Sequence, residues 1–153
     1  MAGPTVGILV PIKIDQKISD EISKYIYERA DEVRRSDFWI DGHPLIYSLG
    51  PDYPEELDDY SGIESSLGWQ PKDIIGLCAM CNGREDHIKL GEITLAVARI
   101  VNGYVMFGSS LNFYTSDPAI LESEDFFEFK DESIIGVDLF SKWLNHKDFY
   151  MVK

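Results

Sequence analysis

The centre of the predicted fold is Asp73-Ile-Ile-Gly-Leu-Cys-Ala-Met-Cys81, a stretch that is apolar on both faces of an extended chain. Such a stretch is typical of a strand in the middle of a sheet, where other elements cover both sides. Asn82 and Gly83 break it, because both residues favour turns. We therefore predict a central strand over residues 73–81.

A helix and another strand follow at once. Asp86 can cap the helix, and Gly103 suits the position just after a helix end. Residues 104–107 are predicted as the next strand. The apolar side of the helix is formed by Leu90, Ile93, Val97, Ile100 and Val101.

The chain before residue 73 supplies the other core elements. Residues 5–12 are rich in β-branched side chains and predict the first strand, with Pro11 near an edge or a turn. Asp15 can cap a helix that we expect to run to about Arg35. The apolar face of this helix would consist of Ile18, Ile22, Ile26, Ala30 and Val33.

Two strand pieces and an acidic connector come next. Residues 38–40 and 45–49 are predicted as strands, because residues 41–44 between them favour a turn. Residues 51–68 are predicted to form a connector with a short helix near residues 63–67.

With the two strand pieces 38–40 and 45–49 counted as one strand, the order strand, helix, strand, strand, helix, strand (βαββαβ) is the split βαβ arrangement of ferredoxin-like folds. After Gly108 we expect a C-terminal strand-helix-strand extension, formed by residues 126–129, 137–145 and 149–152. No repeat or linker divides the chain. The predicted fold class is therefore α/β, of the α+β type, in a single domain of residues 1–153.

Composition and sequence patterns favour a soluble, cytoplasmic protein. The chain is 44% hydrophobic, which suffices for a folded core, yet no apolar run reaches the length of a membrane span. The N-terminal residues lack the basic start and the apolar stretch of a signal peptide. Two cysteines, Cys78 and Cys81, are too few to cross-link a secreted fold.

Negative charge dominates the composition. The 27 acidic and 14 basic residues give a formal net charge of −13. Such a surface repels nucleic acid and favours a basic protein partner, although acidic residues also serve simply to keep a protein in solution. The charge is concentrated, since residues 36–71 contain no Lys or Arg. The first acidic cluster is Asp37, Asp41, Asp52, Glu55, Glu56, Asp58, Asp59 and Glu64, and the second is Asp117, Glu122, Glu124, Asp125, Glu128, Asp131 and Glu132.

The two cysteines are predicted to be buried packing groups. A redox pair needs its first thiol at a helix N-terminus, whereas these residues lie in a predicted strand with their side chains on opposite faces. A zinc site would have to combine both cysteines with His87 and either His43 or His146, without the close spacing of zinc motifs. We therefore expect no metal and no cofactor.

The sequence contains none of the usual catalytic motifs. It lacks a nucleophile elbow and a phosphate-binding loop, and none of its three histidines has an acidic partner that the sequence identifies. His87 is expected to have a surface or capping role, and His146 to lie near a helix C-terminus. These absences favour a binding protein over an enzyme.

The candidate partner-binding surface is the acidic connector. Aromatic residues beside carboxylates can form an interface with apolar anchors and an anionic rim. Tyr53 and Tyr60 are favoured as anchors over Trp39 and Tyr47, because their neighbours are charged and turn-forming. The predicted partner-binding residues are Asp52, Tyr53, Glu55, Glu56, Asp58, Asp59, Tyr60 and Glu64.

Several short motifs resemble a known family. They are Met1-Ala-Gly-Pro4, Cys81-Asn-Gly with Asp86-His87, Gly103-Tyr-Val-Met-Phe-Gly108, and Trp143-Leu, His146, Asp148-Phe and Met151-Val-Lys153 near the end. Together they resemble a family of small bacterial proteins of unknown function, suspected to be immunity proteins of polymorphic toxin systems. The resemblance implies an inhibitor of a cognate toxin and supplies no catalytic residues. The alternatives are an acidic regulatory adaptor or nucleic-acid mimic, and a zinc-binding or enzymatic domain.

Overall fold

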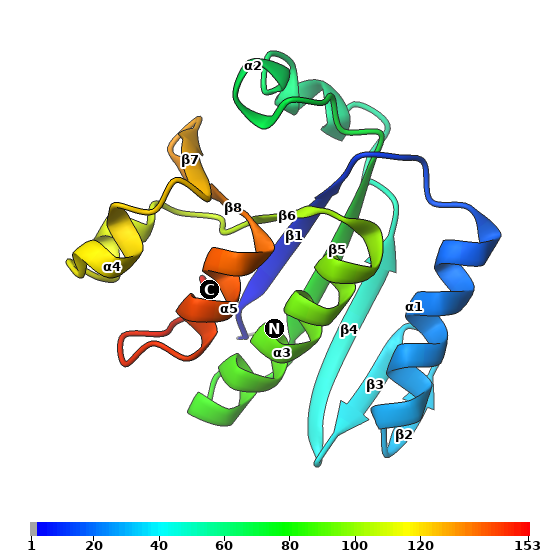
Figure 1. The fold of residues 1–153 in the computed structure, drawn as a ribbon. Coiled ribbons are helices and arrows are strands. Elements are labelled where there is room, and N and C mark those ends of the chain that lie inside the picture. The colour runs from blue at the N-terminus through cyan, green and yellow to red at the C-terminus, as the bar shows by residue number, and fades with distance from the viewer. Residues whose placement is uncertain (1–2) are drawn as a thin grey trace.

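The computed structural model describes residues 3–153 and has an α+β fold, as predicted (Figure 1). One sheet of eight strands has the order β2-β3-β4-β5-β1-β6-β8-β7, and every pair of neighbouring strands is antiparallel. The strands are β1 (Thr5–Val10), β2 (Glu32–Arg34), β3 (Asp37–Ile40), β4 (His43–Leu49), β5 (Asp73–Ala79), β6 (Tyr104–Met106), β7 (Phe126–Phe129) and β8 (Glu132–Ile135). The helices are α1 (Gln16–Arg29), α2 (Glu64–Leu67), α3 (Arg84–Val101), α4 (Pro118–Leu121) and α5 (Val137–Leu144), with two 3₁₀ helices, η1 (Glu56–Tyr60) and η2 (Leu111–Phe113).

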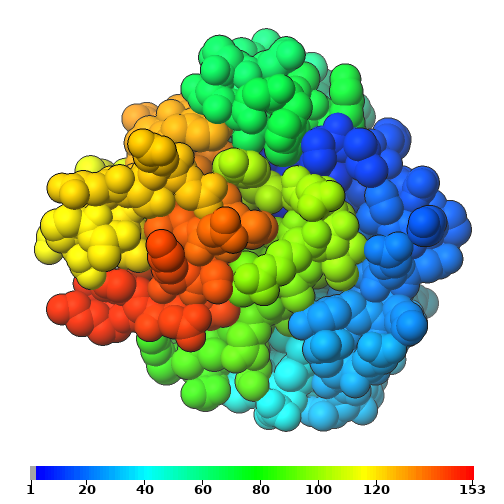
Figure 2. All heavy atoms as spheres, in the orientation of Figure 1, coloured from blue at the N-terminus to red at the C-terminus, as the bar shows by residue number. Residues whose placement is uncertain are grey.

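The predicted central strand is β5, which lies between β4 and β1. Its side chains alternate between two packing layers. Ile75, Leu77 and Ala79 are buried in the main core with apolar residues of α1, α3 and α5, whereas Ile74 belongs to a smaller cluster on the other face of the sheet. The three long helices cover one face, and Figure 2 shows them side by side across it.

The ferredoxin-like topology is not confirmed. Between α1 and β5 the chain forms a meander of three strands, β2, β3 and β4, where that topology has a single strand, and β8 and β7 extend the sheet beyond β6. A split βαβ unit is nevertheless present, because α3 connects β5 to β6 and both of these strands pair antiparallel with β1 between them. The turn before β4 is as predicted, with Asp41 and Gly42 both at positive φ.

The first helix is shorter than predicted. Its N-cap is Asp15, whose carboxylate accepts a hydrogen bond from the backbone N–H of Ile18 at 2.9 Å, as expected. The helix ends at Arg29 rather than near Arg35. Val33 lies instead in β2 opposite Phe38, because strand pairing with β3 satisfies the backbone there and Val favours an extended chain.

Both ends of α3 differ from the prediction. The N-cap is Gly83, and Asp86 is the third helical residue, where its carboxylate accepts a hydrogen bond from the backbone N–H of Gly83 at 2.8 Å. At the C-terminus the left-handed residue is Asn102, with φ of 52°, rather than Gly103. Gly103 is needed for space, since an added Cβ would lie 2.6 Å from the backbone oxygen of Leu9.

The predicted C-terminal extension is correct only in part. Strand β7 and helix α5 lie where expected, but β8 pairs with β7 in a hairpin that the sequence analysis missed. The predicted strand over residues 149–152 is wrong. This segment lies in no strand and contacts β1 through one hydrogen bond, from the backbone N–H of Thr5 to the oxygen of Val152 at 2.9 Å. Phe149 and Met151 alternate with more exposed neighbours, which explains the misleading strand-like pattern.

No helix within residues 3–153 is long and apolar enough to cross a membrane.

Candidate functional site

The fold brings parts of the two acidic clusters together. The ring of Tyr60, in η1, stacks on Phe129 of β7 with 6.1 Å between centroids, and its hydroxyl donates a hydrogen bond to Glu132 at 3.2 Å. Lys130, in the turn between β7 and β8, donates to the backbone oxygen of Asp59 at 2.6 Å. Figure 2 shows the green connector against the orange hairpin. The two acidic clusters, which are far apart in the sequence, therefore meet at these residues.

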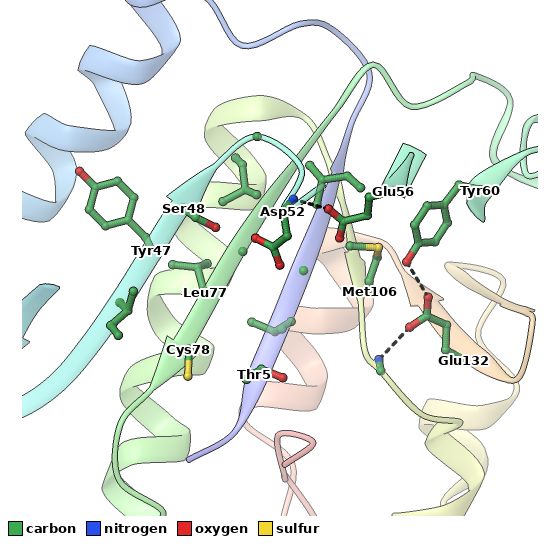
Figure 3. A pocket seen from close by; sticks show the side chains of 18 residues that line it. Thr5, Tyr47, Ser48, Asp52, Glu56, Tyr60, Leu77, Cys78, Met106 and Glu132 are labelled. Carbon is green, nitrogen blue, oxygen red and sulfur yellow. Dashed lines mark hydrogen bonds between the residues drawn. The ribbon is translucent and has the colours of Figure 1, made fainter. Parts of the chain in front are cut away.

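A groove of about 320 Å³ lies beside this contact, on the sheet face opposite the long helices (Figure 3). We call it the sheet groove. Its floor crosses four neighbouring strands at one register position. Ser48 of β4 pairs with Gly76 of β5, Gly76 with Gly7 of β1, and Gly7 with Met106 of β6. Because Gly7 and Gly76 have no side chains, the tip of Met106 and the hydroxyl of Ser48 lie over them and the floor stays low.

Three carboxylates line the groove. Asp52 and Glu56 come from the connector, and the backbone N–H of Asp52 donates to Glu56 at 2.6 Å. Glu132 comes from β8 and accepts hydrogen bonds from Tyr60 and from the backbone N–H of Gly108. Burial raises the pKa of Glu132, and burial together with the nearby Glu132 charge raises the pKa of Tyr60. The groove is therefore a partly desolvated site with negative potential.

The predicted partner-binding residues divide into two groups. Asp52, Tyr53, Glu55, Asp58, Asp59 and Glu64 are exposed, whereas Glu56 and Tyr60 are half-buried. Tyr53 is 48% exposed and donates its hydroxyl hydrogen bond to Asp59 at 2.7 Å, so it is accessible as expected. Tyr60 is not the free anchor that the sequence suggested, because its ring packs against the hairpin.

Sequence reasoning missed the residues that complete the groove. Glu132 was assigned to the second cluster, with no indication that it meets the connector. The floor residues Ser48, Gly7, Gly76 and Met106 were not identified either. A signal was present, since glycines at the centres of two strands indicate a sheet face with little side-chain cover. The sequence did not reveal that the two strands pair at these glycines.

The chain matches the model of a protein family along nearly all of its length. The model of a family of unknown function, DUF6368, matches residues 2–153. The chain belongs to DUF6368. This membership confirms the resemblance of its short motifs to a family of unknown function. No curated protein and no solved structure matches the chain.

Two histidines of this DUF6368 chain have carboxylate partners that the sequence did not identify. His43 is 2.9 Å from Asp86, and His146 is 2.7 Å from Asp117. The other ring nitrogen of His146 accepts a hydrogen bond from the backbone N–H of Asp148. Among residues 3–153, no Ser, Thr or Cys side chain hydrogen bonds to an imidazole. The pairs therefore tie α3 to β4 and α5 to the chain before α4, without the nucleophile of a triad.

His87 is buried, which corrects its predicted surface role. It is 4% exposed and accepts a hydrogen bond at Nδ1 from the backbone N–H of Met151. Its Nε2 lies 3.0 Å from the side-chain oxygen of Asn82, an arrangement that suits a neutral ring with its proton on Nε2. Burial, with a smaller effect of the Arg84 charge, lowers the pKa of His87.

We predict that His87 destabilises the fold in acid. Because its pKa is lower in the native than in the unfolded state, the unfolded chain binds more protons as the pH falls below about 6.5. The free energy of unfolding should therefore decrease from that pH downward through the native pKa. Denaturant titrations at a series of pH values measure this decrease. His87→Gln cannot titrate and should show a shallower decrease; equal slopes for the two proteins would contradict the prediction.

The cysteines differ from the prediction at one position. Cys78 is partly buried in β5, but Cys81 is exposed. The two thiols are free, and no group of three or more His, Cys, Asp or Glu residues within residues 3–153 could hold a metal ion. Leu77 and Ala79, the neighbours of Cys78 in β5, are buried in the core and hold Cys78 in place. Cys81 lies just beyond the end of this strand.

We expect the two thiols to react at different rates. Burial raises the pKa of Cys78, which reduces its thiolate fraction, and access to its sulfur is limited. A disulfide reagent at neutral pH should therefore modify Cys81 first and Cys78 in a slower phase. Cys81→Ser should remove the fast phase alone. The prediction fails if Cys78→Ser removes the fast phase instead.

Proposed function

We propose that this DUF6368 protein is a non-enzymatic binding protein that neutralises a cognate toxin by occluding it with an acidic surface. The observation that carries the proposal is the sheet groove, which is lined by Asp52 and Glu56 of the first acidic cluster and Glu132 of the second. A groove built from segments far apart in the chain forms a defined concave surface. It is a better binding site than an acidic loop alone.

Charge supports a basic protein as the partner. The chain has a formal net charge of −13, and the connector that supplies Asp52 and Glu56 to the groove also carries the exposed carboxylates of Glu55, Asp58 and Asp59. The negative electrostatic field of these charges attracts a basic protein and raises the rate of encounter. The same field repels nucleic acid and the anionic surfaces of membranes. The partner that fits this surface is therefore a basic protein.

The toxin assignment is supported by the sequence motifs that resemble suspected immunity proteins. Neutralisation of a toxin demands fast capture and a stable complex, because uncaptured toxin damages the cell. Long-range attraction accelerates capture, and aromatic side chains within the interface slow dissociation. Tyr53, 48% exposed beside Asp59, provides such a side chain at the edge of the acidic surface.

Expression with the product of the neighbouring gene tests the proposal. If that product is toxic, the DUF6368 protein should restore growth and copurify with it as a complex that weakens as salt increases. A tagged acidic protein of similar net charge serves as the control and should neither copurify nor restore growth. Growth inhibition that persists although both proteins accumulate would contradict the proposal. Binding to many unrelated basic proteins would favour the adaptor alternative.

A further inference from the structure

The sheet face that carries the groove is covered only in part. At one end, the connector and the β7–β8 hairpin pack over Leu9, Ile74 and Met106, which are buried. Beyond them, Ser48 is exposed and Cys78 is partly buried on the same face. The groove begins where this cover ends, so one wall is formed by the connector and the floor by the sheet, with only Met106 and Ser48 over its two glycines (Figure 3).

The shape of the groove favours a long, unbranched side chain. Because Met106 and Ser48 lie low over Gly7 and Gly76, a flexible stem can pass along the floor above them, and the thioether of Met106 offers it an apolar surface. The labelled side chains of Asp52, Glu56 and Glu132 lie around this floor in Figure 3. A stem that lies along this floor would thus bring its end group to the carboxylates.

The charges of the groove specify the end group. Three lining residues are carboxylates, and none of the lining residues is Lys or Arg. Glu132 is already hydrogen-bonded by Tyr60 and Gly108, while the Asp52 carboxylate accepts no hydrogen bond from residues 3–153. A guanidinium group complements this arrangement better than an ammonium group, because it sheds water more easily and offers donors in several directions.

We propose that the sheet groove binds an arginine side chain of the basic partner, with its stem along the floor over Met106 and its guanidinium between Asp52, Glu56 and Glu132. This inference rests on the proposed function and names the chemistry that the site recognises. The groove then provides a specific contact, whereas the exposed carboxylates around it act chiefly on the rate of encounter.

Two matched double variants test the inference with a tetra-arginine peptide as probe. Asp52→Asn with Glu56→Gln removes both connector charges of the groove, and Glu55→Gln with Asp58→Asn removes two exposed charges of the same segment outside it. Both change the net charge equally. Calorimetric titration should show at least about tenfold weaker binding for the groove variant and no more than about twofold for the control, because exposed charges are screened.

Amide NMR spectra of the unmodified protein locate the peptide independently of the variants. The signals of Gly7, Gly76 and Ser48 should shift on addition of tetra-arginine. Equal weakening by the two variants, or shifts confined to the exposed connector, would overturn the inference. Equally tight binding of tetra-lysine would overturn the choice of a guanidinium. A different result would contradict the proposed function: the unmodified protein would neither bind nor neutralise the neighbouring gene product.

Discussion

Replacement of Trp143 by alanine is expected to lower the free energy of unfolding by about 3–5 kcal/mol, the usual cost of removing a large aromatic side chain from a core. Trp143 is fully buried, and its ring lies beside Phe107 and Phe149. Its indole N–H also donates to the backbone oxygen of Tyr150 at 3.2 Å. The substitution thus leaves a cavity and releases the C-terminal segment from α5.

Urea unfolding of Trp143→Ala, followed by circular dichroism, measures this loss. Phe113→Ala is the matched control, because it also removes an aromatic ring but from a residue that is 78% exposed. The control should change the free energy of unfolding by no more than about 0.5 kcal/mol. Met151 belongs to the released C-terminal segment, and its amide donates a hydrogen bond to His87. Hydrogen exchange at this amide should therefore accelerate in Trp143→Ala. A change below about 1 kcal/mol would contradict this account of the core.

Reversal of Glu55, Glu56, Asp58 and Asp59 to lysine is expected to slow association with the basic partner by about tenfold or more at low salt. These residues belong to the connector beside the groove, and all but Glu56 are exposed. Long-range attraction acts chiefly on the rate of encounter, so the salt dependence of association should also flatten. Stability should fall by only about 0.5 kcal/mol for each exposed substitution.

Binding kinetics at low and high salt, with a thermal melt of each variant, measure these effects. The matched control reverses Asp20, Glu21, Glu28 and Glu32, which are exposed on α1 and β2. Both variants have the same net charge, so a difference between them reports the position of the charges. The connector variant should associate more slowly than the control. Equal association rates, with both proteins folded, would place the interface outside the connector.

Local sequence signals predicted much of the fold because they act over short distances. The apolar stretch of β5, the Asp15 cap and the turn before β4 depend on neighbouring residues, and each lies where expected. The errors arose where a distant segment decided the outcome. Val33 fits either a helix face or a strand, and pairing with Phe38 selects the strand. The segment 149–152 resembles a strand but packs beside His87 and Trp143 instead.

Only part of the candidate site could be predicted from the sequence. The acidic connector, with Tyr53 and its carboxylates, could be recognised because charged and turn-forming residues are typical of exposed segments. Glu132 could not be linked to Tyr60, which lies 72 residues earlier in the chain. The burial of His87 was equally hidden, because it depends on the docking of the C-terminal segment onto α3.

The sequence by itself determined the α+β class, the central position of β5 and the strongly acidic character of the connector. Only the tertiary structure decided that β2, β3 and β4 form a meander at one edge of the sheet, that Gly7 pairs with Gly76, and that Glu132 meets the connector. The physical reason is the range of the interactions. Periodicity, capping and turn preferences act within a few residues, whereas strand order follows from burying apolar surface across the whole chain, and the groove exists only where that order places two glycines side by side.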